Sequence, residues 1–263
     1  MSKKWLKVAL MVTAIATGTS IQVDAETVLY VPQDDRPVSL QYTVDTAKAA
    51  GMTVLTPPQN LISGKTYKGQ ADQIWNWVEQ NAGRADVMVL STDTLIYGGL
   101  VDSRKHNLPL STLENRLKRI EALKANHKNT RIYGFGTVMR SPRASGGGTE
   151  PSYYADYGPT IFQIAALQDK LDAGTLTQAE TQKLMSLQAS VPVEYLQDWF
   201  SRRQKNMQVN KDLIDEARNG VFAYFALGHD DTSQLSQSAL EGRYLNQYSK
   251  GIPRTQYGSF PGA

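Results

Sequence analysis

The stretch VPQDDRPVSL, residues 31–40, decides how the fold of this chain is interpreted. It follows the apolar run TVLYV at 27–31, whose β-branched residues are typical of a buried strand. Asp34, Asp35 and Arg36 come directly after that run. Charged groups at the end of a buried strand need partners, because water reaches them only in part. We expect this strand end to be part of a site, or else an Asx turn in which one carboxylate caps the next helix.

The same succession of apolar run, polar tip and amphipathic helix recurs along the chain. Strands are predicted at 27–31, 52–55, 86–90, 131–138 and 221–227, and helices at 42–50, 71–81, 111–126 and 236–248. Strands that alternate with helices predict an α/β fold with a parallel sheet and right-handed crossovers. We expect a partial TIM-barrel-like arrangement, with an open flavodoxin-like sheet as the alternative.

A long helical insertion is predicted after the fourth strand, over about residues 153–219. Gly174 fits a helix C-cap, Thr177 and Glu180 match a capping box, and Pro192 fits the start of a further helix. These signals indicate two or three helices. Two roles stay open: a lid over the site, or a helical subdomain that takes no part in binding.

The first residues have the pattern of an export signal. Three lysines precede a mostly apolar stretch at 8–21, and small residues follow it before Glu26. We predict a signal peptide over 1–25 and an α/β domain over 26–263. The protein would then be secreted, either periplasmic or extracellular, with no stable membrane association after cleavage. An uncleaved membrane anchor is the alternative, for which the apolar stretch is short.

Composition excludes several classes of function. The chain has a formal net charge of +3, and residues 1–25 contain three lysines and one aspartate, so the remainder carries +1. That balance gives no electrostatic reason to expect a nucleic-acid partner. The sequence contains no cysteine, which excludes disulfides, thiolate metal sites and a cysteine nucleophile.

Polar residues gather at the predicted strand ends. In parallel α/β folds, ligands bind beyond the carboxyl ends of the strands, where loops from separate strands meet. The residues at these ends are Asp34, Asp35, Arg36, Ser91, Thr92, Asp93, Tyr97, Arg140, Ser141, His229, Asp230 and Asp231. Each of them alone also fits a turn, a helix cap or a packed side chain. The prediction of a site therefore depends on their meeting at one rim.

Several familiar motifs do not occur. The sequence has no HExxH, GxSxG or EF-hand pattern. The YGG segment at 97–99 lacks the spacing of a dinucleotide-binding or P-loop motif, so we interpret Gly98 and Gly99 as a tight turn. His106 and His127 are expected in surface loops.

Glycoside hydrolysis suits several carboxylates that converge on one pocket. It needs one protonated and one ionised carboxyl group, and clustered aspartates differ in pKa because like charges repel. We predict Asp93, Asp230 and Asp231 as catalytic residues of a hydrolase that acts on a small molecule, a glycan or a glycoconjugate. Substrate binding is assigned to Asp34, Asp35, Arg36, Ser91, Tyr97, Arg104, Arg140 and His229.

Two other functions use the same residues. The carboxylates together with His229 would suit a divalent cation that activates water, although the leading interpretation requires no cofactor. A non-catalytic carbohydrate or cell-wall binding protein would use the polar strand ends for binding alone.

Four ordered blocks of the sequence resemble a known family. VPQDDRPVS, STDTLIYGGLVDSR, VMRSP and GHDDTSQLSQSALEGRYL are similar to blocks of a bacterial family, domain of unknown function 4127 (DUF4127). The resemblance covers nearly all of residues 26–263, and Gln33 and His229 depart from the family pattern. It implies where a site lies, and leaves the reaction to be inferred. It marks as signature positions Asp34, Asp35, Arg36, Pro37, Ser91, Asp93, Tyr97, Gly98, Gly99, Arg104, Arg140, Asp230, Asp231 and Glu241.

The end of the chain is also similar to a part of that family. GSFPGA, at 258–263, resembles the opening of a later family block. We expect a C-terminally truncated member with an incomplete family domain, whose barrel, if it is one, stays open with unpaired strand edges. Little or no activity is expected from such a chain.

Overall fold

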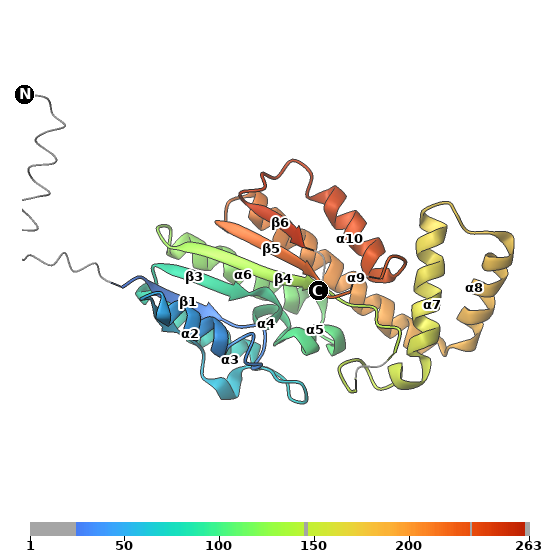
Figure 1. Ribbon diagram of the computed structural model, residues 1–263, viewed down its shortest axis with the longest axis horizontal. Helices are drawn as coiled ribbons and strands as arrows, with labels where there is room; N and C mark the ends of the chain where they lie inside the picture. Colours follow the sequence, from blue (N-terminus) through green and yellow to red (C-terminus); the bar gives the residue numbers. More distant parts are fainter. Residues whose placement is uncertain (1–24, 145–146, 232, 261–263) are drawn as a thin grey trace, which may run out of the picture.

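A computed structural model of the chain describes residues 25–144, 147–231 and 233–260 (Figure 1). Six parallel strands form one sheet in the order β2-β1-β3-β4-β5-β6. The strands are β1 (Thr27–Val31), β2 (Thr53–Leu55), β3 (Val87–Ser91), β4 (Arg131–Val138), β5 (Tyr224–His229) and β6 (Tyr257–Phe260). The predicted signal peptide lies outside the described residues, apart from Ala25. Among the described helices, none is long and apolar enough to cross a membrane.

The predicted α/β fold with a parallel sheet is confirmed, and the sheet is open. β1 lies between β2 and β3. This is the strand order of the flavodoxin-like alternative, in which the direction of winding reverses between β1 and β3. The sixth strand, β6, pairs with β5 and was not predicted, because Tyr257–Phe260 is short and includes a glycine and a serine.

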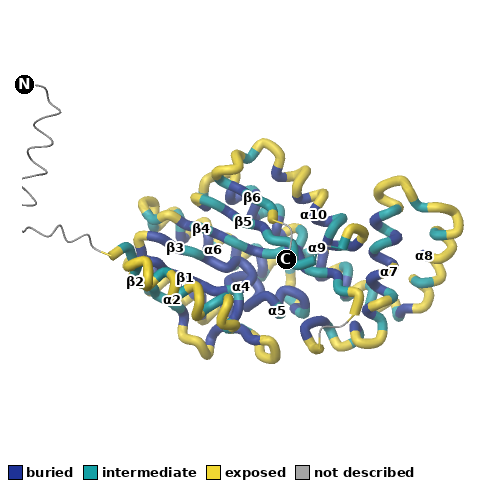
Figure 2. The backbone as a smooth tube through the Cα atoms, in the orientation of Figure 1, coloured by how far each residue is buried: buried dark blue, intermediate teal, exposed yellow. Residues whose placement is uncertain are grey.

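Helices connect the strands along the described chain. They are α2 (Gln41–Ala49), α3 (Ala71–Asn81), α4 (Thr92–Tyr97), α5 (Leu100–Lys105), α6 (Leu110–Asn126), α7 (Tyr154–Asp172), α8 (Gln178–Ser190), α9 (Val193–Arg218) and α10 (Gln237–Tyr248), with short 3-10 turns η1 (Gln59–Leu61) and η2 (Ala82–Arg84). Leu29, Met88 and Ile132 point from the sheet into the main core, together with apolar residues of α3, α6 and α9. Val89 and Tyr133 point to the opposite face, on the side of α2, and are only half-buried. Figure 2 shows the central strands as buried and intermediate, in contrast to the mostly exposed helix α8.

The helical insertion after the fourth strand is confirmed as three helices, α7, α8 and α9. Thr177 and Glu180 form the predicted capping box, in which each side chain accepts a hydrogen bond from the other residue's backbone N–H. The helices α7 and α8 stand away from the sheet (Figure 1) and share a second apolar cluster with the first half of α9. The second half of α9 packs in the main core, so one helix joins the two clusters.

Candidate functional site

The carboxyl ends of the strands surround a cavity of about 320 Å³. We call it the arginine cavity, because three arginines line it. Its lining residues are Asp34, Arg36, Gly64, Lys65, Leu100, Val101, Arg104, Arg140, Thr149 and Asp230. They come from the ends of β1, β4 and β5, from α5 and from two loops. None of the described lining residues belongs to the insertion α7–α9.

Glycines allow two backbone segments to pack together beside the arginine cavity. Gly98 ends α4 with a φ of 109°, in the left-handed region that favours glycine. A Cβ atom on Gly69 would lie 1.9 Å from the carbonyl oxygen of Gly98, and one on Gly99 would meet a side chain of the same loop at 1.8 Å. This contact holds the loop that carries Lys65 against the turn before α5, which carries Arg104.

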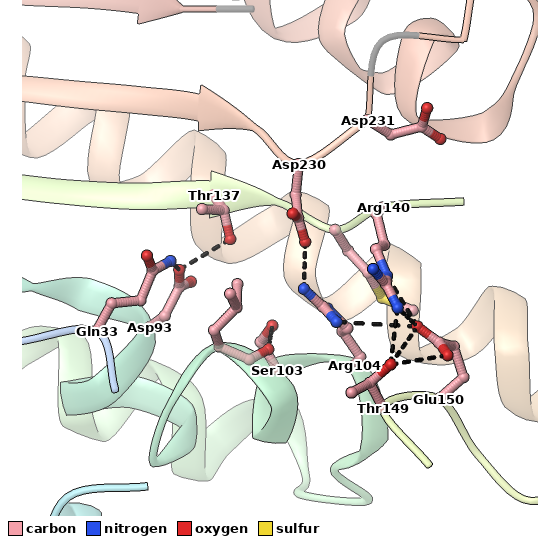
Figure 3. A network of polar contacts seen from close by, with 12 residues as sticks. Gln33, Asp93, Ser103, Arg104, Thr137, Arg140, Thr149, Glu150, Asp230 and Asp231 are labelled. Atoms are coloured by element: carbon pink, nitrogen blue, oxygen red, sulfur yellow. Dashed lines mark hydrogen bonds and ion pairs between the residues drawn. The ribbon is translucent and has the colours of Figure 1, made fainter. Parts of the chain in front are cut away.

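Arg104 is the most buried of the three arginines, with a side chain 5% exposed. Its Nη2 donates to Asp230, and its Nη1 lies 3.8 Å from Glu150 Oε1 (Figure 3). Its Nε has no partner among the described residues. Burial lowers the pKa of Arg104, and the charge of Asp230 opposes that effect. Asp230 itself is 26% exposed, so Arg104 holds a carboxylate that also faces the cavity.

Arg140, at the end of β4, is held by a loop carboxylate. Its Nε donates to Glu150 Oε1 at 2.8 Å, and its Nη2 donates to Thr149 Oγ1 at 2.7 Å and to Glu150 (Figure 3). The Glu150 side chain is fully buried, which makes its ion pairs to two arginines a structural requirement.

The end of β1 contributes a carboxylate, Asp34, and a guanidinium group, Arg36, to the cavity wall. Asp34 Oδ2 accepts from Arg36 Nε at 2.8 Å and pairs with Arg36 Nη2 at 2.7 Å, while its Oδ1 accepts from the Arg36 backbone N–H at 3.2 Å. The last contact is the Asx turn that the sequence allowed, but no carboxylate caps the next helix, since the N-cap of α2, Leu40, has no side-chain hydrogen bond. Both residues nevertheless line the arginine cavity, so the turn and the site are the same feature.

Asp93 lies at the start of α4, near Asp230 but enclosed. Asp93 is 2% exposed. Its Oδ2 accepts hydrogen bonds from Gln33 Nε2 at 2.9 Å and from Thr137 Oγ1 at 2.8 Å (Figure 3). Burial raises the pKa of Asp93 to about 6, the two hydrogen bonds oppose the rise, and the charge of Asp230 adds to it. Asp93 is not among the residues that line the arginine cavity.

Other predicted residues point elsewhere. Asp35 accepts from the Tyr67 hydroxyl and lines a separate groove toward α2. Asp231 accepts from the backbone N–H groups of Ser141 and Ser233, at 3.1 and 2.8 Å, and points away from Asp230 (Figure 3). His229 contacts Ser259 Oγ at 3.0 Å, on the side of β6.

Two predicted residues have packing contacts rather than a place in the cavity lining. Ser91 caps α4 by accepting from the Thr94 N–H at 3.3 Å. Tyr97 is buried and stacks on His106, with 5.0 Å between ring centroids. The prediction that His106 lies on the surface is wrong: it is buried against Asn206, because α9 covers the loop after α5, and burial lowers its pKa to about 4.

Sequence reasoning missed Lys65, Thr149 and Glu150. Lys65 lies in the loop after β2 and η1, and Thr149 and Glu150 lie in the loop after β4, but all three are well past the strand ends, so a search of the strand ends alone does not reach them. A second carboxylate, Glu241, was marked by family resemblance alone. It forms a buried ion pair with Arg203, whose Nη atoms also donate to the carbonyl oxygens of Met139 and Arg140 at 2.7 and 2.9 Å. This pair fixes the backbone end of β4, from which Arg140 projects.

The described residues contain no group of three or more His, Asp or Glu side chains placed to bind a metal ion together. The arginine cavity is instead a set of paired charges with guanidinium groups at its wall. Such a surface suits oxygen-rich ligands, which accept forked hydrogen bonds from arginine.

The chain matches the model of a known family. The model of the family described as "Protein of unknown function (DUF4127)" matches residues 28–263. A search of curated proteins found no match.

Proposed function

Because the chain belongs to the family of proteins of unknown function DUF4127, whose description states no reaction, we propose a function from the arginine cavity itself. The protein is a hydrolase that acts on a glycan or glycoconjugate. The cavity lies beyond the carboxyl ends of β1, β4 and β5, beside the point where the winding of the sheet reverses, which is where ligands bind in such folds.

The observation that carries this proposal is the environment of Asp230. It is a partly exposed carboxylate in the wall of the cavity, and the buried Arg104 pairs with it. Glycoside hydrolysis needs an ionised carboxylate beside the scissile bond, either as nucleophile or as base toward water. Asp230 takes that role, and Arg36 and Arg140 bind the hydroxyl groups of the sugar.

Hydrolysis also needs an acid that protonates the leaving oxygen. Two neighbouring carboxyl groups whose surroundings separate their pKa values are the usual solution. Burial raises the pKa of Asp93 to about 6, and the charge of Asp230 adds to the rise. We assign the acid to Asp93; because it does not line the cavity, it has to act on the leaving oxygen through an intervening water. Asp231, which bonds to backbone N–H groups, has no chemical role in this proposal.

A panel of aryl glycosides tests the reaction. Asp230→Asn is expected to lower turnover by roughly 10² to 10⁴ fold, the usual loss when a catalytic acid or base is removed. Asp156→Asn, an exposed aspartate at the start of α7, is the matched control and keeps full turnover. Equal turnover by wild type and Asp230→Asn on a cleaved substrate would contradict the role of Asp230.

One observation favours a second candidate, a protein that binds glycans without cleaving them. Both carboxylates in the cavity wall already have an arginine partner, and Asp93 is enclosed. Calorimetric titration distinguishes the two. Glycan binding with no product after long incubation, and affinity unchanged in Asp93→Asn, supports binding alone.

Export remains part of the proposal and has its own test. The pattern of residues 1–25 supports cleavage before Glu26. Expression of the whole chain in a bacterial host, followed by N-terminal sequencing of the secreted or periplasmic product, is expected to give Glu26 as the first residue. A product that keeps Met1 in the membrane fraction would support the anchor alternative.

A further inference from the structure

One cation in the wall of the arginine cavity has no carboxylate partner among the described residues. Arg36, Arg104 and Arg140 are each paired with a carboxylate, namely Asp34, Asp230 and Glu150 respectively. The fourth cation of the lining, Lys65, forms no ion pair with a described residue, and it lies at an exposed position on the cavity wall.

Arg104, in the same cavity wall, has a side-chain donor without a hydrogen-bond acceptor among the described residues. The Nε atom of Arg104 is buried and donates to no described residue. Buried donors in proteins are nearly always satisfied, so an orphan beside a cavity indicates a missing acceptor. Because Arg104 lines the same cavity as Lys65, a bound group with oxygen acceptors would lie beside this unsatisfied donor and would pair with the charge of Lys65.

The single charge of Lys65 distinguishes between classes of anion. A group with one negative charge, such as the carboxylate of a uronic acid, pairs with it. A phosphate monoester carries close to two negative charges at pH 7 and would leave its second charge near Asp34 and Asp230, both in the same wall.

We infer that the arginine cavity recognises a sugar that carries one carboxylate group, as a uronic acid does, with Lys65 as the residue that selects for that charge. The inference rests on the proposed function only in taking the ligand to be a sugar. It deepens that proposal by naming the class of substrate, an acidic glycan.

Three sugars that differ only at carbon 6 test the inference: glucose, sodium glucuronate and glucose 6-phosphate. Each is titrated into the whole chain by calorimetry, at low and at high salt. Glucuronate is expected to bind at least tenfold more tightly than glucose and more tightly than glucose 6-phosphate. Its advantage over glucose should shrink at high salt, because ions screen an exposed charge.

Lys65→Gln is the decisive variant, because Lys65 is exposed and its removal leaves the three ion pairs intact. It should lose most of the preference for glucuronate and bind glucose as the wild type does. Lys183→Gln, at an exposed position on α8, is the control and keeps the preference. Equal unfolding temperatures of the two variants show that both are folded.

The outcomes separate this inference from the proposed hydrolase. Preferential binding of glucuronate without cleavage of any glycoside supports the inference and removes the hydrolase. Cleavage of neutral glycosides, with no preference for the acidic sugar in binding, does the reverse. Tighter binding of glucose 6-phosphate, or no binding of any of the three sugars, overturns the inference.

Discussion

Two arginine–carboxylate clusters meet at Arg140, and they are built differently. The backbone carbonyl of Arg140 belongs to the cluster of Arg203 and Glu241, in which every described polar atom of Arg203 has a partner. The side chain of Arg140 belongs to the arginine cavity. There, among the described residues, a buried nitrogen of Arg104 has no hydrogen-bond acceptor and Lys65 has no ion-pair partner. A saturated polar cluster fixes structure, whereas an unsaturated one at a cavity wall is where a ligand completes the set.

Breaking the saturated cluster should have the largest effect. Glu241→Gln leaves the charge of Arg203, which is 1% exposed, uncompensated in the core. Removal of one partner from a buried ion pair costs about 3 to 5 kcal/mol, and we expect a loss of that order in the free energy of unfolding, measured with urea. Glu79→Gln, which breaks the more exposed pair with Arg119, is the matched control and should cost less than about 1 kcal/mol. Similar losses in both variants would remove the distinction.

Asp93 resembles the saturated cluster in being buried and hydrogen-bonded, but unlike those residues it becomes protonated in mild acid. Its pKa in the folded protein, about 6, is above the ordinary value of 3.8. The folded state therefore holds this proton more tightly, and the resulting stability is complete below pH 3.8 and lost as the pH rises through 6. The loss amounts to about 3 kcal/mol.

Asp93→Asn removes this dependence, because the amide does not ionise. The stability of the variant relative to wild type is expected to rise between pH 4 and pH 7 by on the order of 3 kcal/mol. Urea unfolding at a series of pH values measures it, with Asp156→Asn as the reference. Curves for wild type and Asp93→Asn that stay parallel over this range would show that Asp93 does not titrate there.

Asp230→Asn tests the unsaturated cluster and should cost less stability than Glu241→Gln. Arg104 loses one charged hydrogen bond but keeps Glu150 at 3.8 Å, and Asp230 is partly hydrated. We expect a loss of about 1 to 2 kcal/mol in urea unfolding. A loss in unfolding free energy as large as that of Glu241→Gln would mean that Asp230, like Glu241, mainly stabilises the fold by pairing with a buried arginine.

Arg36→Gln should have the smallest effect on stability. The Arg36 side chain is 55% exposed, and exposed ion pairs contribute at most about 1 kcal/mol. Differential scanning calorimetry should therefore give nearly the same unfolding temperature as wild type. The same variant should bind glucuronate more weakly, which would assign Arg36 to the ligand rather than to the fold.

Most strand and helix positions could be predicted because apolar runs mark them directly. The short helices α4 and α5 were missed, because the sequence there indicates a polar strand end and a tight turn. The strand order could not be predicted, since barrels and open sheets both alternate strands with helices, and only the pairing of β1 with both β2 and β3 reveals it. β6 was missed for a local reason: Gly258 and Ser259 interrupt a strand of four residues.

Half of the candidate site follows from the rule that ligands bind at strand ends. Asp34, Arg36, Arg140 and Asp230 lie where that rule places them. The rule fails for the adjacent residue at two strand ends. Asp35 and Asp231 point to other sides, where Asp35 accepts from the Tyr67 hydroxyl and Asp231 accepts from backbone N–H groups. Glu150 was beyond reach, since only tertiary packing brings its loop under Arg104 and Arg140.

The close packing of Gly69 on the Gly98–Gly99 turn has a genetic consequence. A side chain at Gly69 would collide with backbone, which cannot give way as a flexible side chain does, and Gly98 combines a left-handed backbone with tight surroundings. A saturation-mutagenesis library sorted for soluble protein should therefore return glycine codons almost alone at 69 and 98. At Gly51, which also has a positive φ but nothing within 4 Å, asparagine should survive the sort as well.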